Sequence, residues 1–272
     1  MPNSAAWSLP AHQLVGLFGA VRRTLNRHGV SGVLGKAVQV AGDWRKSRGA
    51  VAEPDAFDVE FGTDTAGVVP LWKLHIDGPH REHGVRYQAV DPARVRRCLA
   101  ALPIRFSNYT YVDLGSGKGR SLLVASEFPF QRVIGVEFAA ELHTVAEQNL
   151  RRFPSTQRRC RSVESVYADA AAFDLPRSDL VLFLYNPFGA EVLEAVVERL
   201  ERSLEAHDRS VYVVYHNPVE RRLFDASTSF EALPDGGETA FFVHRPRTAT
   251  AKSPRSQRGP ERLAPVTDPE RT

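Results

Sequence analysis

Residues 109–120 constrain the fold of this chain more than any other stretch, and they read Tyr-Thr-Tyr-Val-Asp-Leu-Gly-Ser-Gly-Lys-Gly-Arg. The β-branched and aromatic residues at the start predict a strand, and the alternating glycines predict a tight turn. The apolar run that follows predicts a helix. A strand, a glycine-rich turn and a helix form the first unit of a nucleotide-binding α/β sheet, whose turn presents backbone N–H groups to a ligand.

The spacing of the glycines excludes a P-loop, which requires G-x-x-x-x-G-K-[ST]. Here Val112 stands five residues before Gly117, and Gly119 follows Lys118. The run also differs from the dinucleotide fingerprint G-x-G-x-x-G, since it reads Asp-x-Gly-x-Gly-x-Gly with Asp113 at its head. A strand–helix turn that binds no ligand remains an alternative on this evidence.

The Asp-x-Gly-x-Gly-x-Gly run resembles motif I of the class I S-adenosylmethionine (SAM) methyltransferases. That resemblance implies an α/β fold, a doubly wound, seven-stranded Rossmann-like sheet with a terminal antiparallel hairpin. It also implies SAM as the cofactor, with Asp113, Gly115, Ser116 and Gly117 in its binding site. The resemblance covers residues 57–245.

Composition limits the compartment and the partners. The 272 residues suit one medium domain with appendages. Two cysteines form neither a disulfide framework nor a metal pattern, so we expect a reducing, cytoplasmic compartment and no metal. We find no apolar run of membrane-span length and no secretory signal peptide.

The net charge of +3 is unevenly distributed: residues 1–50 carry +6 and residues 245–272 carry +4, which leaves −7 for the rest. An acidic body argues against a broad nucleic-acid-binding face. The basic ends suit peripheral contact with an acidic partner or a membrane surface, or they are simply solvated. Hydrophobic spacing predicts helices in a basic segment over 1–50, and composition predicts a disordered basic tail over 246–272. The resemblance implies a SAM-binding domain over 91–245, preceded by a cap or linker segment over 51–90 that contributes to the site.

The cap segment carries hydroxyl and acidic side chains between Gly62 and Gly67. It resembles a Gly-x-Asp-Thr-x-Gly segment that precedes the SAM domain in a group of bacterial methyltransferases, which implies that Thr63 and Thr65 bind the cofactor. A turn whose hydroxyls only satisfy its own backbone is the alternative. His80 and His83 have a spacing that suits a metal, but no ligand pattern accompanies them.

Two further acids follow predicted strands. Glu137 ends the strand over 132–137, 20 residues after Gly117, where nucleotide-binding sheets place the acid that binds ribose hydroxyls. A carboxylate that only stabilises the next helix N-terminus is the alternative. Asp169 follows the strand over 162–167, and the resemblance implies a contact with the adenine amino group, for which Asp174 competes.

The apolar strand over 180–185 ends in Asn186-Pro187-Phe188, a turn expected to face the transferred methyl group. It resembles the Asn/Asp-Pro-Pro-Tyr/Phe motif IV of amino-group methyltransferases but has one proline, and it is closer to the Dot1-like, lysine-directed branch. The resemblance makes Asn186, Pro187 and Phe188 the catalytic residues, with an Asn oxygen and a backbone carbonyl holding an amine. An Asn that merely caps the next helix is the alternative.

The strand over 210–215 ends in His216-Asn217-Pro218, and a hairpin over 230–233 and 239–244 follows. We expect His216 to be structural, with proton acceptance as the alternative. The sequence therefore predicts SAM-dependent methyl transfer to an amine nitrogen of a protein lysine or a small molecule, with a nucleic acid as the less favoured acceptor. A nicotinamide-dependent oxidoreductase and a non-catalytic SAM-fold binding protein stay open.

Overall fold

The structure is a computed structural model that describes residues 54–74 and 84–247. Several sequence-based predictions lie outside the described residues. These are the basic helices of residues 1–50, the three histidines His75, His80 and His83, and the tail from residue 248 onward.

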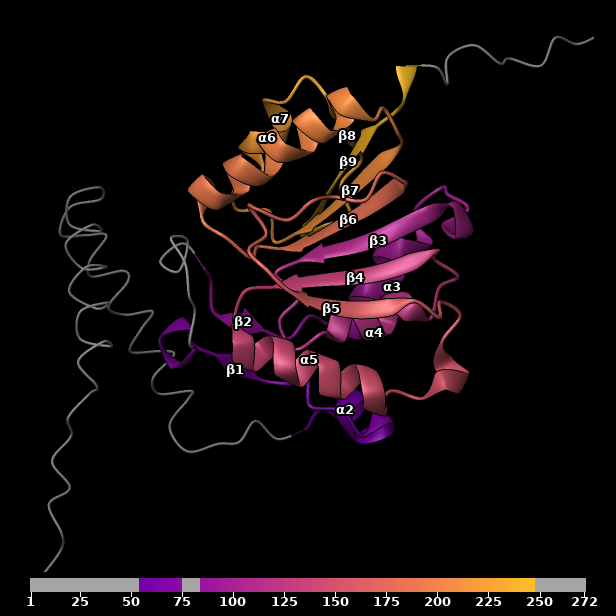
Figure 1. Ribbon diagram of the computed structural model, residues 1–272, viewed down its shortest axis with the longest axis vertical. Coiled ribbons are helices and arrows are strands. Elements are labelled where there is room, and N and C mark those ends of the chain that lie inside the picture. Colours follow the sequence, from indigo (N-terminus) through magenta and orange to yellow (C-terminus); the bar gives the residue numbers. More distant parts are fainter. Residues whose placement is uncertain (1–53, 75–83, 248–272) are drawn as a thin grey trace, which may run out of the picture.

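A seven-stranded sheet forms the centre of the molecule, in the order β5-β4-β3-β6-β7-β9-β8 (Figure 1). Its strands are β3 (Tyr109–Leu114), β4 (Arg132–Glu137), β5 (Val163–Tyr167), β6 (Asp179–Tyr185), β7 (Val211–His216), β8 (Glu231–Leu233) and β9 (Thr239–His244). Strands β3 to β7 are parallel, and β9 is antiparallel to both β7 and β8. This confirms the predicted doubly wound, Rossmann-like methyltransferase sheet with a terminal antiparallel hairpin.

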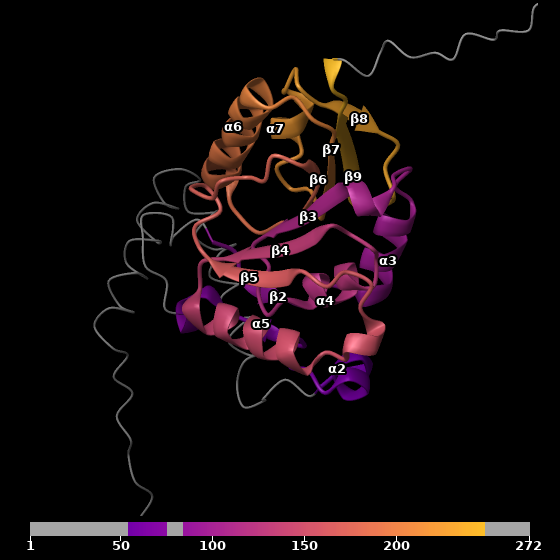
Figure 2. The same cartoon turned by 45° about the vertical axis from the view of Figure 1, so that its right-hand side comes forward.

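Helices cover both faces of the sheet (Figures 1 and 2). The helices are α2 (Ala56–Phe61), α3 (Pro92–Ala100), α4 (Arg120–Ser126), α5 (Ala140–Arg152), α6 (Ala190–Ala206) and α7 (Arg222–Asp225), with single 3-10 turns η1 (Leu71–Lys73), η3 (Phe106–Asn108) and η4 (Ser155–Gln157). Residues of α2, α3 and α4 pack on one face, and those of α6 and α7 pack on the other. Helix α5 lies along β5 at the edge of the sheet.

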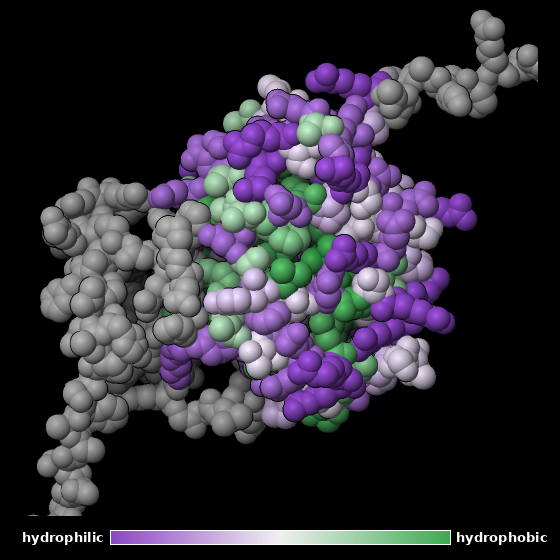
Figure 3. Space-filling model, viewed as in Figure 1, coloured by the Kyte–Doolittle hydropathy of each residue, from purple (hydrophilic) through white to green (hydrophobic). Residues whose placement is uncertain are grey.

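The central strands are buried on both sides, which explains their nearly continuous apolar sequences. Tyr111 and Val181 point to the α3–α4 core, whereas Val112 and Leu182 point to the α6–α7 core. The connection from β5 to β6 contains no helix, and its Phe173 packs partly buried against the second core. On the surface seen from the viewpoint of Figure 1, hydrophobic residues gather in the middle and hydrophilic residues surround them (Figure 3).

The segment before the main sheet contains a short helix and a small sheet that the sequence analysis does not predict. Helix α2 begins after Asp55, whose side chain accepts a hydrogen bond from the Asp58 N–H, and it ends at Gly62 with a φ of 65°. A two-stranded sheet of β1 (Val68–Val69) and β2 (Tyr87–Gln88) follows. None of the helices in the described ranges is long and apolar enough to cross a membrane.

Candidate active site

A cleft opens at the carboxyl ends of β3, β4 and β6. The chain adds β4 and β5 on one side of β3 and then β6 and β7 on the other, so the strand order changes direction at this point. Ligands of open α/β sheets bind at this point. Residues from the two strand-end turns, the two predicted acids and the β2 segment line it, and they include Asp113, Gly115, Ser116, Gly117, Glu137, Tyr185, Asn186, Pro187, Phe188 and residues 85–88. The structure thus brings together most of the predicted site residues.

The glycine turn needs its glycines for two separate reasons. Gly115 and Gly117 have φ values of 83° and 56°, and residues with a Cβ adopt this backbone conformation only at a cost in free energy. A Cβ on Gly115 would also lie 2.5 Å from Pro187 Cβ, and a Cβ on Gly117 would overlap the Tyr87 ring. The turn therefore touches the Asn-Pro-Phe turn on one side and Tyr87 on the other.

Ser116, between these glycines, places its hydroxyl against the sheet rather than in the open cleft. A Cβ built on Gly135 of β4 would lie 2.6 Å from the Ser116 Oγ. The hydroxyl is buried without a hydrogen-bond partner among the described residues. Its predicted role in binding the cofactor stays a prediction.

Glu137 is buried at the end of β4 and is tied to the glycine turn. Its carboxylate accepts hydrogen bonds from the Gly117 N–H at 2.8 Å and from the Ala139 N–H at 2.9 Å. Burial raises the pKa of Glu137 to about 7, against the opposing effect of these hydrogen bonds. A carboxylate has about four acceptor positions, so backbone donors including Gly117 and Ala139 leave capacity for a further donor.

Asp113 lies beside Glu137 at the end of β3 and accepts a hydrogen bond from the Ser121 hydroxyl of α4. Burial raises the pKa of Asp113 to about 7, and the nearby Glu137 charge contributes to the rise. Two buried carboxyl groups with raised pKa values at one strand edge mark a candidate functional site.

Asn186 occupies an unusual backbone conformation in the cleft, with a φ of 39°. The alternative role of a helix cap is wrong, because α6 begins at Ala190 and its cap is Gly189. The Pro187 carbonyl accepts a hydrogen bond from the Val85 N–H at 3.3 Å, and Phe188 forms a β-bridge with Gly84. The Asn-Pro-Phe turn is thus bonded to the residues that precede β2.

Asp169 lines a smaller hollow next to the cleft, together with Gly115, Phe138 and Phe188. Its carboxylate accepts a hydrogen bond from the Ala171 N–H at 2.9 Å. The competing acid, Asp174, is 98% exposed, pairs with Arg199 and is not among the described residues that line either space. The position therefore favours Asp169 over Asp174.

Thr63 and Thr65 lie in a buried network, and neither is among the described residues that line the cleft. Their hydroxyls donate to Asp58 Oδ1 at 2.7 and 2.6 Å. Both hydroxyls are thus engaged with the protein itself, and a contact of either with a cofactor stays a prediction.

His216 is buried at the end of β7, with its Nδ1 3.1 Å from the Thr239 hydroxyl. Its ring lies 4.7 Å from that of Tyr185, centroid to centroid, and His216 is not among the described residues lining the cleft. Burial lowers its pKa. This position agrees with the expected structural role.

Three residues near the site escaped the sequence analysis: Tyr87, Lys118 and Arg120. Lys118 Nζ is 2.7 Å from Asp64, and the Arg120 side chain is 4% exposed and pairs with Asp55 and Asp58. The sequence does carry a signal for these ion pairs. It has two cations at the glycine turn and helix start, and three aspartates in the segment upstream, Asp55, Asp58 and Asp64. Among the described residues, no group of His, Cys, Asp and Glu side chains is arranged to hold a metal.

No family model matches the chain, and no curated protein matches it. Among solved structures, it is similar to an RNA methyltransferase from Salinibacter ruber in complex with S-adenosyl-L-homocysteine (SAH), with 20% identity and a TM-score of 0.40, over 58% of this chain and 94% of that chain. A ribosomal protein L11 methylase from Lactobacillus delbrueckii has 16% identity and a TM-score of 0.39, over 63% of this chain and 81% of that one. These likenesses concern the fold; the activity has to be argued from the site.

Proposed function

We propose that this protein is a SAM-dependent methyltransferase that transfers a methyl group to an amine nitrogen. The single observation that carries the proposal is the convergence of the glycine turn, Glu137 and Asn186 in one cleft at the switch point of the sheet. A glycine turn alone would be weak evidence, but the acid and the Asn-Pro-Phe turn lie beside it in space.

The residues present fit SAM. The Glu137 carboxylate would accept hydrogen bonds from ribose hydroxyls, and Asp169, which lines the adjoining hollow, would accept one from an adenine amino group. The bare backbone of Gly115 lets the Asn-Pro-Phe turn lie directly against the glycine turn, because a Cβ there would meet Pro187. Bound SAM supplies an electrophilic sulfonium methyl group.

The Asn-Pro-Phe turn lines the part of the cleft that would bind the methyl-accepting amine. The amine lone pair forms the new N–C bond as the S–C bond breaks, which leaves SAH, and the amine proton passes to water. A lysine acceptor has to lose a proton first, at a cost of about 4–5 kcal/mol at pH 7. Desolvation between Tyr185 and Phe188, with the Asn186 oxygen accepting an N–H, would supply part of this. The acceptor is a protein lysine or a small-molecule amine.

Calorimetric titration with SAM and SAH tests the proposal, with wild type beside Glu137→Ala. We expect micromolar binding to wild type and a loss of about tenfold or more in the variant, because the ribose acceptors are gone. Glu164→Ala is the matched control, since Glu164 is a carboxylate on the neighbouring strand that pairs with Arg132 outside the cleft.

Two competing functions predict different titrations. A nicotinamide-dependent oxidoreductase would bind NAD(H) or NADP(H) and not SAM, and the glycine spacing and the Asn-Pro-Phe turn argue against it. A non-catalytic SAM-fold protein would bind SAM and transfer no methyl group to any component of a cell extract. Asn186 lines the cleft beside the glycine turn, where its side chain can hold an acceptor amine, and this favours catalysis over mere binding.

A further inference from the structure

The ring of Tyr87 covers the middle glycine of the turn. A Cβ on Gly117 would overlap two carbons of the ring, so the ring lies directly against the Gly117 backbone. Tyr87 also lines the cleft together with Glu137 and Asn186. The wall of the cleft over the glycine turn is therefore an aromatic face contributed by β2, a strand outside the main sheet.

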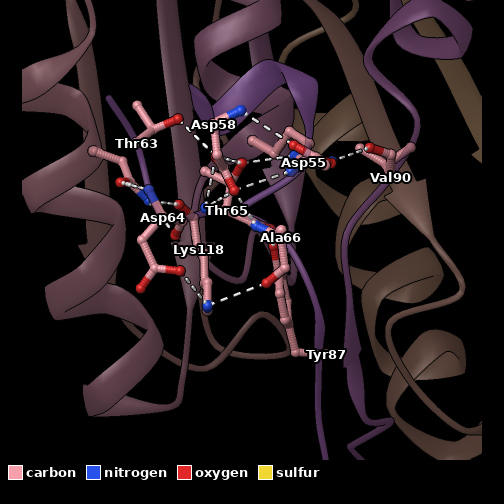
Figure 4. A network of polar contacts seen from close by, with 11 residues as sticks. Asp55, Asp58, Thr63, Asp64, Thr65, Ala66, Tyr87, Val90 and Lys118 are labelled. Carbon is pink, nitrogen blue, oxygen red and sulfur yellow. Dashed lines mark hydrogen bonds and ion pairs between the residues drawn. The ribbon is translucent and has the colours of Figure 1, made fainter. Parts of the chain in front are cut away.

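One atom fixes the far end of this ring. The Tyr87 hydroxyl donates a hydrogen bond to the Thr65 carbonyl oxygen at 2.5 Å. The rest of Thr65 is held firmly, because its N–H donates to both Asp58 oxygens at 2.9 Å and its hydroxyl accepts from Arg120 Nε at 2.7 Å. Figure 4 shows Thr65 between Asp58 and Tyr87.

Asp58 is the centre of this arrangement and is 2% exposed. It also accepts from the Thr63 hydroxyl and, at 2.6 Å, from the Ala66 N–H. Burial raises the pKa of Asp58, but the hydrogen bonds outweigh it and keep the pKa below the usual value. A charged carboxylate with this many donors holds its partners rigidly. The segment before the sheet is therefore built to fix the position of the Thr65 carbonyl.

We propose that Tyr87 is a cofactor-binding residue whose ring packs against the cationic methionine half of SAM, and that Thr65 positions it. The inference rests on the proposed function. The face of an aromatic ring attracts a cation, and it does so more strongly where water is excluded. SAM carries a sulfonium charge that SAH lacks, so the ring distinguishes the cofactor from the product.

Calorimetric titration of the full chain with SAM and with SAH tests this role in Tyr87→Ala, Tyr87→Leu and Thr65→Val. We expect Tyr87→Leu to keep the packing and to weaken SAM binding relative to SAH binding by about 2- to 30-fold, the range of a cation–π contact. Tyr87→Ala weakens both ligands further, because it also removes the wall. Thr65→Val weakens SAM about threefold through a less fixed ring.

Thr63→Val is the matched control for Thr65→Val. Both variants remove a hydroxyl that donates to the same Asp58 oxygen, but only Thr65 contacts Arg120 and Tyr87. We expect Thr63→Val to bind SAM within twofold of wild type. Equal losses in the two variants would overturn the positioning role of Thr65.

Three results bear on the role of Tyr87 itself. Unchanged ratios of SAM to SAH affinity in a folded Tyr87→Leu protein would overturn it, and Tyr87→Leu decides the matter if Tyr87→Ala does not fold. Tighter SAM binding to Tyr87→Ala would show that the ring occupies the cofactor's place, which also overturns it. Failure of wild type to bind SAM or SAH removes the proposed function and this inference together, whereas wild-type binding that the Tyr87 variants leave unchanged removes only the inference.

Discussion

Strands β6 and β7 end in turns of the same local chemistry. One reads Tyr185-Asn186-Pro187 and the other His216-Asn217-Pro218. The strands are adjacent and parallel, with Tyr185 paired to His216 in register. Both asparagines have positive φ, 39° for Asn186 and 49° for Asn217, and a proline follows each. Asparagine suits both positions because its short polar side chain tolerates the left-handed region.

The neighbours of the two turns differ. Pro187 touches Gly115 of the glycine turn, and Asn186 lines the cleft. Asn217 is exposed, and its N–H donates to the Glu238 carbonyl oxygen at 2.8 Å in the connection to the antiparallel strand β9. An Asn-Pro turn thus becomes part of a site through its place beside the switch point, not through its own sequence.

The strongest test of this difference removes each asparagine side chain in turn. Glycine relieves the positive φ, so Asn186→Gly and Asn217→Gly both delete the side chain without adding strain. We expect Asn186→Gly to lower methyl transfer by about 100-fold, because a poorly held acceptor loses its alignment. Transfer of labelled methyl from SAM into a cell extract measures it, with SAM affinity retained.

Asn217→Gly is the control and should transfer methyl at the wild-type rate within about twofold. Equal losses in the two variants would mean that both turns contribute to the site and would break the comparison. A parallel loss of SAM affinity in Asn186→Gly would instead place Asn186 in the cofactor-binding part of the cleft.

A second test adds one methyl group, by substitution with alanine, to a glycine of the cleft and to a glycine of the terminal hairpin. Gly115 and Gly237 have φ values of 83° and 71°, so alanine is strained at both. At Gly115 the Cβ meets Pro187 at 2.5 Å, whereas at Gly237 no described atom lies within 4 Å. We expect Gly115→Ala to lower the free energy of unfolding by about 1–3 kcal/mol more than Gly237→Ala, as overpacking does. Denaturant unfolding of the two variants measures the difference, and equal losses would show that the Asn-Pro-Phe turn yields to the methyl group.

The sequence was sufficient to predict most of the fold because its strands bury both faces and read as apolar runs between clear turn signals. Strands β3 to β7 and the terminal hairpin lie where the sequence predicts them. The glycine turn, Glu137 and Asn186 meet as predicted, since carboxyl ends of parallel strands share one edge of a sheet.

The sequence could not reveal contacts that depend on long-range packing. Tyr87 lies against Gly117 because β2 lines the cleft, and no local pattern in the sequence encodes this contact. The hydrogen bond from the Thr65 hydroxyl to Asp58, seven residues earlier, likewise forms only in the folded chain. Helix α2 was missed because it is six residues long and depends on a cap at each end.

The buried acid at the end of β4, Glu137, gives a third test, because the turn after β7 (His216-Asn217-Pro218) contains no acidic residue. Burial raises the pKa of Glu137 to about 7, and the ionised form is the better acceptor for ribose hydroxyls. We therefore expect SAM affinity to fall by up to about tenfold per pH unit as pH drops below 7. Calorimetry from pH 8 to pH 5.5 measures this, and Glu137→Gln should flatten the dependence.

The same raised pKa affects the stability of the ligand-free protein in the opposite direction. A raised carboxyl pKa stabilises the fold fully below the unfolded value of 4.5, and that contribution is lost as pH rises through about 7. Thermal unfolding should thus show Glu137→Gln losing this part of the pH dependence. An unchanged pH profile in Glu137→Gln for both affinity and stability would mean that another group controls them.

The smallest expected effect is that of His216→Gln at the end of β7. Burial lowers the pKa of the His216 side chain, so the imidazole is neutral at pH 7. Its Nδ1 already has a hydrogen-bond partner, the Thr239 hydroxyl. Glutamine can keep a hydrogen bond to Thr239, and we expect a loss of about 1 kcal/mol in stability. Methyl transfer should stay within about threefold of wild type with an unchanged pH profile, because Tyr185 of β6, and not His216, lines the cleft. A large drop in transfer at retained stability would make His216 a participant in proton removal, and the two strand ends would then act as one site.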